Sequence, residues 1–408
     1  MVILLLLWVV SLPLLGQEVP RVLFIGNSYT EVNDLPQMVM QVAGSMGETM
    51  TVASNTPGGC TFMQHCTNQS MTLICQGGWD VVVLQEQSQY PSFPQGQVEQ
   101  EVFPYAARLV DSVYAHNPCA EPMFYMTWGR KNGDAQNAQF FPVLGTYEGM
   151  DSMLALRYGQ MAHDNDASLC PVGRVWRYLR TYHPDIELYA SDGSHPSVAG
   201  TYAAACAFYV MIFHRNPMDI SHAPDLAAGV AQKIREAVCE VVYTQLEQWQ
   251  RPRPQAEAEI GEISGLTVFF RAHTLHADSL WWDFGDGIMA THDSVVSHSY
   301  AAAGSYNVSL VAGRHCMNAT ATLQVSVGDS TSAISPLVTK DISIIPNPAS
   351  DHVTVSTDSP QAAVQLLDSK GCILMTASGN EVGFNLSALP SGIYLLRVGD
   401  AVQKLIKR

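Results

Sequence analysis

Charged residues are scarce in this sequence, and basic residues are the scarcer kind. Lys and Arg number 21 among the 408 residues and Asp and Glu number 37, so the formal net charge is −16. A chain this acidic argues against nucleic acid or an anionic membrane as a partner, because phosphate binding needs clusters of Lys and Arg. Apolar residues make up 47% of the chain, which excludes a disordered composition and is enough to bury a sizeable core.

Several common motifs are also missing. The nine cysteines form no CxxC pair, so the sequence supports neither a zinc ribbon nor a thioredoxin-like redox site. The sequence contains no EF-hand loop, no P-loop and no GxGxxG fingerprint, and we therefore expect neither a metal site nor a nucleotide cofactor. Cys60, Cys66 and Cys75 are close enough in sequence to pair among themselves, although sequence alone leaves the connectivity open.

A long hydrophobic run lies at the start of the chain. It covers Met1 to Leu15 and is shorter than the ~20 residues that span a bilayer. Polar residues, beginning with Gln17 and Glu18, follow it. The run is typical of a secretory signal peptide, so we expect residues 1–16 to be removed on export and the mature chain to have no stable membrane span.

Three segments with different sequence patterns follow. Residues 19–250 alternate short β runs with amphipathic helical stretches, whereas residues 256–328 and 341–408 are β-like throughout. Buried β runs that alternate with helices predict a doubly wound α/β domain with a parallel sheet, followed here by two small β-sandwich domains. The expected strands of the first segment are 21–26, 50–53, 79–84, 123–127, 169–172 and 186–189, and the expected helices are 34–46, 97–115, 147–163 and 196–215.

Ligands bind such sheets beyond the carboxyl ends of the strands, so the polar turns after strands are candidate sites. Ser28 lies two residues past the end of the first strand, in the turn GNSYT. Asp192 and His195 lie in SDGSHP, which follows the last expected strand and opens a helix. Their three-residue spacing lets the carboxylate reach Nδ1 of the imidazole and leaves Nε2 free to accept a proton from Ser28. We therefore expect Ser28, His195 and Asp192 to form a catalytic triad.

Two further turns carry groups that an oxyanion requires. Gly58 and Gly59 follow the second strand and allow backbone N–H groups to approach a ligand closely. We expect the N–H groups of Ser28 and Gly59 to donate to an oxyanion at ~3 Å. Gln85 and Gln87, in the sequence QEQ directly after the third strand, are candidate side-chain donors. Gln85 is preferred because it emerges first at the strand end.

The order of these motifs resembles that of the SGNH/GDSL hydrolase family. That family places its nucleophilic Ser after the first strand, a Gly after the second, an Asn after the third and Asp-x-x-His before the last helix. The matches here are Ser28, Gly59 and the pair Asp192/His195, and the resemblance covers about residues 21–215. QEQ stands where the family has Gly-x-Asn-Asp. The resemblance implies a flavodoxin-like fold and hydrolysis of ester bonds without a cofactor.

Residues after the other strands are candidates for substrate binding. Trp128 and Arg130 follow the fourth strand, and together with Gly58 they are expected to contact the acyl or alcohol part of the substrate. A packed loop is the alternative for this segment. His65 lies near the Gly58–Gly59 turn, where a structural role is favoured over a place in the cleft.

The two β-like segments carry motifs of their own. Residues 256–328 contain WDFGDG, HSY and GSYNVSL and resemble a PKD domain, which implies a spacer or a weak glycan-binding module. Residues 341–408 contain IPNPA, LPSGIYLLRV and the terminal KLIKR. They resemble the C-terminal sorting domain of the type IX (Por) secretion system of Bacteroidetes. This resemblance implies that the type IX machinery is a partner during export through the periplasm and that the protein is secreted or held at the cell surface. Another binding module is the alternative for the last segment.

Together these features predict a secreted serine esterase that removes small acyl groups, such as acetate, from carbohydrate. The carbohydrate substrate is inferred from the presence of the PKD-like module in the same chain. Two alternatives remain at this point. One is a lipase-like or lysophospholipase-like activity of the same family. The other is a surface adhesin without catalytic activity, which the departure at QEQ keeps open.

Overall fold

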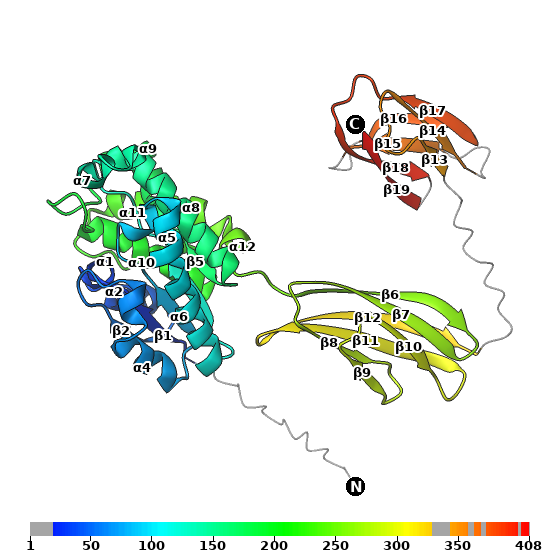
Figure 1. The fold of residues 1–408 in the computed structure, drawn as a ribbon, viewed down its shortest axis with the longest axis horizontal. Helices are drawn as coiled ribbons and strands as arrows, with labels where there is room; N and C mark the ends of the chain where they lie inside the picture. Colours follow the sequence, from blue (N-terminus) through cyan, green and yellow to red (C-terminus); the bar gives the residue numbers. More distant parts are fainter. Residues whose placement is uncertain (1–18, 329–342, 358–362, 369–372, 399–400, 408) are drawn as a thin grey trace, which may run out of the picture. The chain divides into compact units, whose positions relative to one another are not determined.

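The structure is a computed structural model that describes residues 19–328, 343–357, 363–368, 373–398 and 401–407 (Figure 1). The expected signal peptide, residues 1–16, lies outside these ranges. The N-terminal part has a five-stranded parallel sheet in the order β2-β1-β3-β4-β5, which confirms the predicted doubly wound α/β fold. Its strands are β1 (Arg21–Ile25), β2 (Thr51–Asn55), β3 (Val81–Leu84), β4 (Glu121–Tyr125) and β5 (Ser168–Cys170).

Helices cover both faces of this sheet. In β1, Val22 and Phe24 belong to one apolar cluster, whereas Leu23 and Ile25 belong to the other, and all four are fully buried. This alternation explains why the strand is a continuous apolar run. The first cluster is completed by α2 (Leu35–Ser45), α9 (Val172–Tyr182), α10 (Val198–Phe213) and α11 (Ala228–Val238), and the second by α4 (Gln69–Gln76), α5 (Gln95–Glu101), α6 (Phe103–His116) and α8 (Tyr147–Asp164).

Two expected elements differ from the structure. The helix predicted at 97–115 is divided into α5 and α6 at Val102, and Pro104 lies in the first turn of α6, where its missing N–H is tolerated. The strand predicted at 186–189 does not form, and Tyr189 makes only a single bridge, to Pro196. The remaining short elements are α1 (Ser28–Glu31), α3 (Phe62–His65), η1 (Tyr90–Ser92), α7 (Ala135–Ala138), η2 (Pro142–Gly145), η3 (Pro217–Asp219), η4 (Cys239–Tyr243) and α12 (Leu246–Trp249). Within the described residues, no helix has the length and apolar character to cross a membrane.

The segment that follows consists of two antiparallel sheets in the orders β10-β7-β6 and β12-β11-β8-β9. Its strands are β6 (Gln255–Ser264), β7 (Thr267–Leu275), β8 (Ser279–Asp283), β9 (Met289–Thr291), β10 (Val295–Ser299), β11 (Gly304–Arg314) and β12 (Met317–Val327). Residues of the WDFGDG and HSY motifs form its core. Trp282 is fully buried, the rings of Phe284 and His298 stack at 4.2 Å, and His298 Nε2 contacts Asp286 Oδ2 at 2.7 Å. The motif therefore has a structural role.

The C-terminal segment has two sheets of its own, in the orders β13-β14-β17 and β16-β15-β18-β19. The strands are β13 (Ser343–Ile345), β14 (His352–Ser356), β15 (Ala363–Leu367), β16 (Ile373–Ser378), β17 (Glu381–Asn385), β18 (Gly392–Val398) and β19 (Ala401–Lys407). Side chains from both sheets meet in one apolar cluster, which includes Val353, Leu366 and Leu396. The predicted pair of small β-sandwich domains is thus confirmed.

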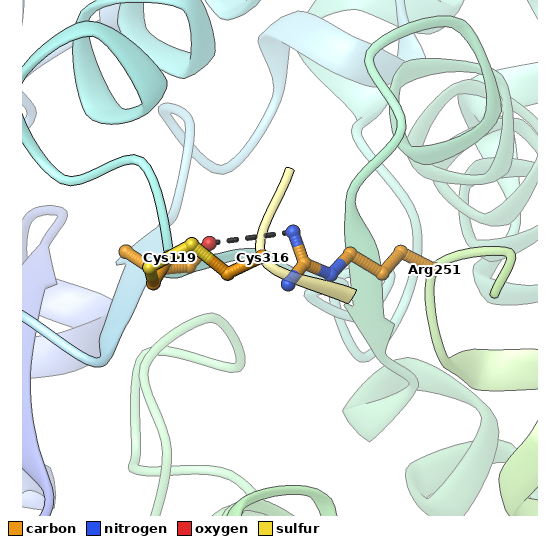
Figure 2. Close-up of a disulfide and its surroundings, with 4 residues drawn as sticks. Cys119, Arg251 and Cys316 are labelled. Carbon is orange, nitrogen blue, oxygen red and sulfur yellow. Dashed lines mark hydrogen bonds between the residues drawn. A yellow bond between two sulfur atoms is a disulfide. The ribbon is translucent and has the colours of Figure 1, made fainter. Parts of the chain in front are cut away.

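A disulfide connects the α/β part with the first β segment (Figure 2). It joins Cys119, between α6 and β4, to Cys316, in the turn between β11 and β12. Cys60, Cys66 and Cys75 are free thiols, so the pairing that their closeness in sequence would allow does not form. Cys60 and Cys66 are buried, and Cys75 is exposed on α4.

Other contacts surround this disulfide. Beside Cys316, the Arg314 Nε lies 2.9 Å from Asp166 Oδ2, and the ring of His315 stacks on Tyr114 with centroids 3.7 Å apart. The guanidinium of Arg251 donates to the Tyr114 hydroxyl at 3.1 Å. It also donates to the carbonyl of Ala120, the residue after Cys119, at 3.3 Å (Figure 2). The turn between β11 and β12 is therefore held by ionic and aromatic contacts as well as by a covalent bond.

Candidate active site

The candidate nucleophile lies in the turn that leaves β1. Helix α1 begins at Ser28, and Asn27 caps it by accepting a hydrogen bond from the Tyr29 N–H at 3.2 Å. Gly26 is required just before this cap, since a Cβ there would lie 2.6 Å from Gln85 Oε1. Strand β1 and the cap together present Ser28, which is half-buried, at the carboxyl edge of the sheet.

Three side chains in this region form a hydrogen-bonded chain. His195 Nε2 lies 2.9 Å from Ser28 Oγ, and its Nδ1 lies 2.5 Å from Asp192 Oδ2. The other carboxylate oxygen of Asp192 accepts the backbone N–H groups of Ser194 and His195 at 2.9 and 3.0 Å. Burial tends to raise the pKa of Asp192, but the hydrogen bonds from His195 and these N–H groups outweigh it and lower the pKa. Asp192 is thus kept ionised beside the imidazole, the arrangement of a serine-hydrolase triad.

The turn that carries His195 is held in place by the segment after β4. Trp128 Nε1 donates to the Ser194 carbonyl at 3.1 Å, and the N–H of Lys131 donates to the Gly193 carbonyl at 2.8 Å. Trp128 stacks between Tyr29 and Trp176, with centroids 4.8 and 3.7 Å apart. Because Trp128 has no exposed surface, it cannot contact substrate as expected from the sequence, and its place is that of a positioning residue.

The turn after β2 carries Gly59, whose N–H is expected to donate to the oxyanion. Gly59 has φ +67°, in the left-handed region that favours glycine, and it is exposed. The turn is fixed by Asn27, whose Nδ2 donates to the Cys60 carbonyl at 3.0 Å. Neither the N–H of Ser28 nor that of Gly59 donates to another group within the described part of the chain. Both are therefore available to an oxyanion. Gly58 is likewise exposed, next to Gly59.

The two glutamine candidates have different surroundings. Gln85 is fully buried, and its amide donates both to Asn27 Oδ1, at 3.0 Å, and to the Glu86 carbonyl. Since both of its N–H bonds are used, Gln85 has none for an oxyanion, and the preference for it over Gln87 is not supported. Gln87 is half-buried, and its side-chain amide donates one hydrogen bond, to Gln89 Oε1 at 3.3 Å, which leaves its other amide N–H free. Gln85 instead supports the turn at Asn27.

Glu86 is a residue that sequence reasoning missed. Its side chain is fully buried, and its carboxylate accepts the N–H of Phe62 at 3.0 Å and the N–H of Gln87 at 2.6 Å. Burial raises the pKa of Glu86 to about 8. The residue thereby joins the turn after β2 to the turn after β3. No signal in the sequence distinguishes a buried carboxyl from a solvated one at a strand end.

His65 has the structural role favoured from the sequence. It is fully buried, with Nε2 2.9 Å from the Gly26 carbonyl and Nδ1 2.8 Å from Ser70 Oγ. Burial lowers the pKa of His65 to about 4, so the ring is neutral and Nε2 is the donor to Gly26. Across the described residues, no group of three His, Cys, Asp or Glu side chains is placed to hold a metal ion.

Comparisons with known families identify the two β segments. Residues 259–327 match the PKD domain family, and residues 343–408 match the secretion system C-terminal sorting domain. The sorting domain indicates export by type IX secretion to the cell surface or beyond. A search of curated protein sequences finds no match to the chain.

Solved structures similar to the N-terminal part include SGNH/GDSL hydrolases and esterases. A DUF4886 family protein from Bacteroides uniformis is 17% identical, with a TM-score of 0.49 over 56% of this chain and 95% of its own. A protein described as an SGNH hydrolase, from Slackia heliotrinireducens, is 28% identical, with a TM-score of 0.39 over 47% of this chain and 97% of its own. A psychrotrophic esterase from Pseudoalteromonas, solved with monoethylphosphonate, is 13% identical, with a TM-score of 0.34 over 46% of this chain and 94% of its own.

Proposed function

We propose that the protein is a secreted serine esterase that removes small acyl groups, such as acetate, from carbohydrate. The observation that carries the proposal is the hydrogen-bonded chain from Ser28 Oγ through His195 to Asp192. A serine hydroxyl in contact with an imidazole that is itself oriented by a carboxylate is the arrangement that activates serine as a nucleophile.

In the proposed reaction, Ser28 Oγ attacks the carbonyl carbon of the ester while Nε2 of His195 accepts its proton. The resulting oxyanion is stabilised by the N–H groups of Ser28 and Gly59 and by the Gln87 amide. His195 then donates the proton to the leaving alcohol, and the acyl group remains on Ser28. Water, activated by His195 in the same way, hydrolyses this acyl-enzyme and restores the serine. No cofactor takes part.

The openness of the site favours an ester that projects from a larger molecule. The side chains of His195 and Asp192 are 35% and 48% exposed, so an acyl group on a polymer can reach Ser28 without the polymer entering a deep cavity. We further propose that residues 19–250 carry the chemistry, that the PKD-like segment at 256–328 serves as a spacer or tether to polymer, and that residues 341–408 serve only in sorting.

A chain-length series of p-nitrophenyl esters tests the proposal. The wild type should hydrolyse the acetate and butyrate esters, with rates that fall for longer chains, and Ser28→Ala should hydrolyse none of them. Equal activity in Ser28→Ala would contradict the assignment of the nucleophile. A marked preference for long-chain esters would favour a lipase-like enzyme, and absence of any hydrolysis by the wild type would favour an adhesin.

A further inference from the structure

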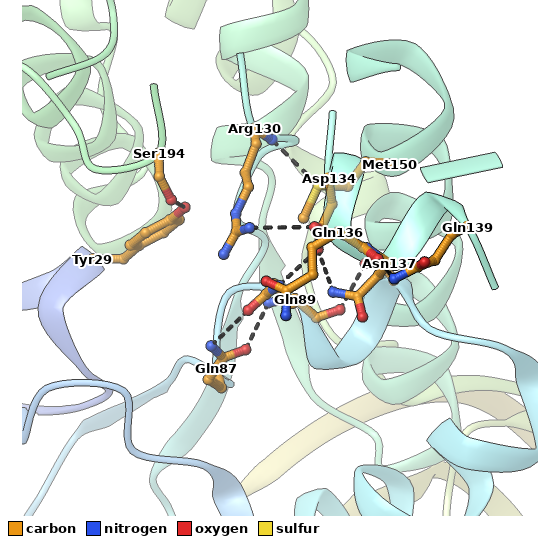
Figure 3. Close-up of polar contacts among 11 residues, drawn as sticks. Tyr29, Gln87, Gln89, Arg130, Asp134, Gln136, Asn137, Gln139, Met150 and Ser194 are labelled. Atoms are coloured by element: carbon orange, nitrogen blue, oxygen red, sulfur yellow. Dashed lines mark hydrogen bonds and ion pairs between the residues drawn. The ribbon is translucent and has the colours of Figure 1, made fainter. Parts of the chain in front are cut away.

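Arg130 lies directly beside the triad turn. Trp128, two residues before it, and Lys131, the residue after it, donate hydrogen bonds to the carbonyls of Ser194 and Gly193. In Figure 3 the guanidinium points into the space between Tyr29 and Ser194 on one side and Gln87 on the other. Burial raises the pKa of Tyr29 and the positive charge of Arg130 opposes that rise, as expected for a cation close to the residue that follows Ser28.

The guanidinium is oriented by a buried carboxylate. Asp134, only 1% exposed, lies 3.4 Å from Arg130 Nη1. Its Oδ2 also accepts the side-chain amides of Gln89 and Asn137 at 2.6 and 2.7 Å (Figure 3). Burial works to raise the pKa of Asp134, but these amides and Arg130 together lower it, so the group stays ionised. Asp134 is therefore held by hydrogen bonds from Gln89 and Asn137, and its ion pair with Arg130 orients the guanidinium.

Much of the hydrogen-bonding capacity of Arg130 is unused. Its Nε is buried and donates to no described residue, and its Nη2 has no hydrogen bond to any of them either. A buried donor without a partner is costly unless a ligand or water accepts its hydrogen bond. The Arg130 side chain is 28% exposed, so the guanidinium can be reached from the site.

We propose that Arg130 forms a subsite for an anionic group, a carboxylate or a sulfate, on the sugar that carries the scissile ester; this rests on the proposed esterase function. The planar guanidinium matches the geometry of such groups. The free N–H of Gln87 can add a neutral hydrogen bond. A cation at this point also attracts an anionic polymer to the site, because the net charge of −16 repels such a polymer from the rest of the molecule.

Binding to Ser28→Ala protein tests the subsite separately from the chemistry. The ligands are an O-acetylated methyl glucuronoside, the matching O-acetylated methyl glucoside and its 6-sulfate, which differ only in the group at C6. Calorimetry should show that the glucuronoside, the 6-sulfate or both bind about tenfold more tightly than the neutral glucoside, and that the preference shrinks as salt is added. Which of the two binds more tightly distinguishes a uronate from a sulfated sugar as the source of the charge.

Adding Arg130→Gln to this protein should abolish the preference and change the affinity for the neutral glucoside less than twofold. Arg108→Gln, which removes an exposed cation from α6, is the matched control and should keep the preference. Equal binding of all three ligands, or an equal loss of charged and neutral ligands in Arg130→Gln, would overturn the proposal. Hydrolysis of the same compounds by the wild type is measured separately, so failure of the esterase function is recognised independently of the subsite.

Discussion

At the scale of single residues, the buried carboxyl of Glu86 makes the stability of the fold depend on pH. Its carboxyl group is buried and tied to the backbone of two turns that border the site. Burial raises its pKa from the ordinary value of 4.5 to about 8. A carboxyl whose pKa is higher in the folded than in the unfolded state stabilises the fold below the unfolded value, and this contribution is lost as the pH rises through the folded value.

We therefore expect the free energy of unfolding of the wild type, relative to that of Glu86→Gln, to fall between pH 4.5 and pH 8. Urea unfolding of both proteins across this range measures the difference, in which the titration of all other groups cancels. Parallel pH profiles for the two proteins would show that Glu86 does not titrate in this range.

At the scale of elements, the turn after β2 supplies a donor to the proposed oxyanion. Gly59→Ala meets no clash, since nothing lies within 4 Å of the added Cβ, but φ +67° strains any other residue. We expect the N–H to turn away from the oxyanion, so that kcat falls by about 10²-fold while KM changes little.

The matched control for this prediction is Gly44→Ala in α2, where the added Cβ also meets nothing within 4 Å and φ is ordinary. It should leave kcat unchanged and stabilise the fold by about 0.5–1 kcal/mol. Steady-state kinetics and thermal melting of the two variants check both expectations. A Gly59→Ala enzyme with wild-type kcat would remove this N–H from the proposed mechanism.

The sequence predicts those parts of the site that are marked by residues close together in the chain. Asp192 and His195 are three residues apart in one turn, and Ser28 directly follows a strand, so their meeting at the carboxyl edge of the sheet follows from the fold class alone. The roles of Gln85, Glu86 and Trp128 depend instead on which atoms of distant turns reach them. Gln85 packs against Gly26, 59 residues earlier in the chain, and no pattern within either segment indicates this contact.

The fold shows the same division. Strands such as β3 were predicted because a strand that is buried on both faces is a continuous run of apolar residues in the sequence. The expected strand at 186–189 did not form, although Ile186 and Leu188 are buried. They pack in the same apolar cluster as Phe208 of α10 rather than pairing with β5. Apolar character predicts burial there, but it does not distinguish a strand from a packed loop.

At the scale of the whole molecule, the disulfide Cys119–Cys316 links residues 19–250, which are proposed to carry the chemistry, to the PKD-like segment. It links residues 197 positions apart, and the oxidising route of an exported protein permits it. We expect the double variant Cys119→Ser/Cys316→Ser to be less stable by about 2–4 kcal/mol. It should still hydrolyse small soluble esters, because every proposed site residue precedes residue 196.

Calorimetric melting of the double variant measures this loss. Cys75→Ser is the control, because it removes an exposed thiol that forms no disulfide and should melt like the wild type. Peptide mapping without reduction should recover Cys119 and Cys316 in one linked fragment. An unchanged melting temperature in the double variant, or free thiols at both positions in the exported protein, would contradict this account.

The most direct test of the central claim is labelling with a fluorophosphonate followed by peptide mapping. An activated serine forms a covalent bond to phosphorus and expels fluoride, whereas an ordinary serine does not react. We expect a single label on Ser28 in the wild type, no label in Ser28→Ala, and labelling slower by about 10⁴-fold in Asp192→Asn, if Asp192 orients His195 as in other triads. A folded wild-type protein that is not labelled, or a label on a serine other than Ser28, would contradict the triad.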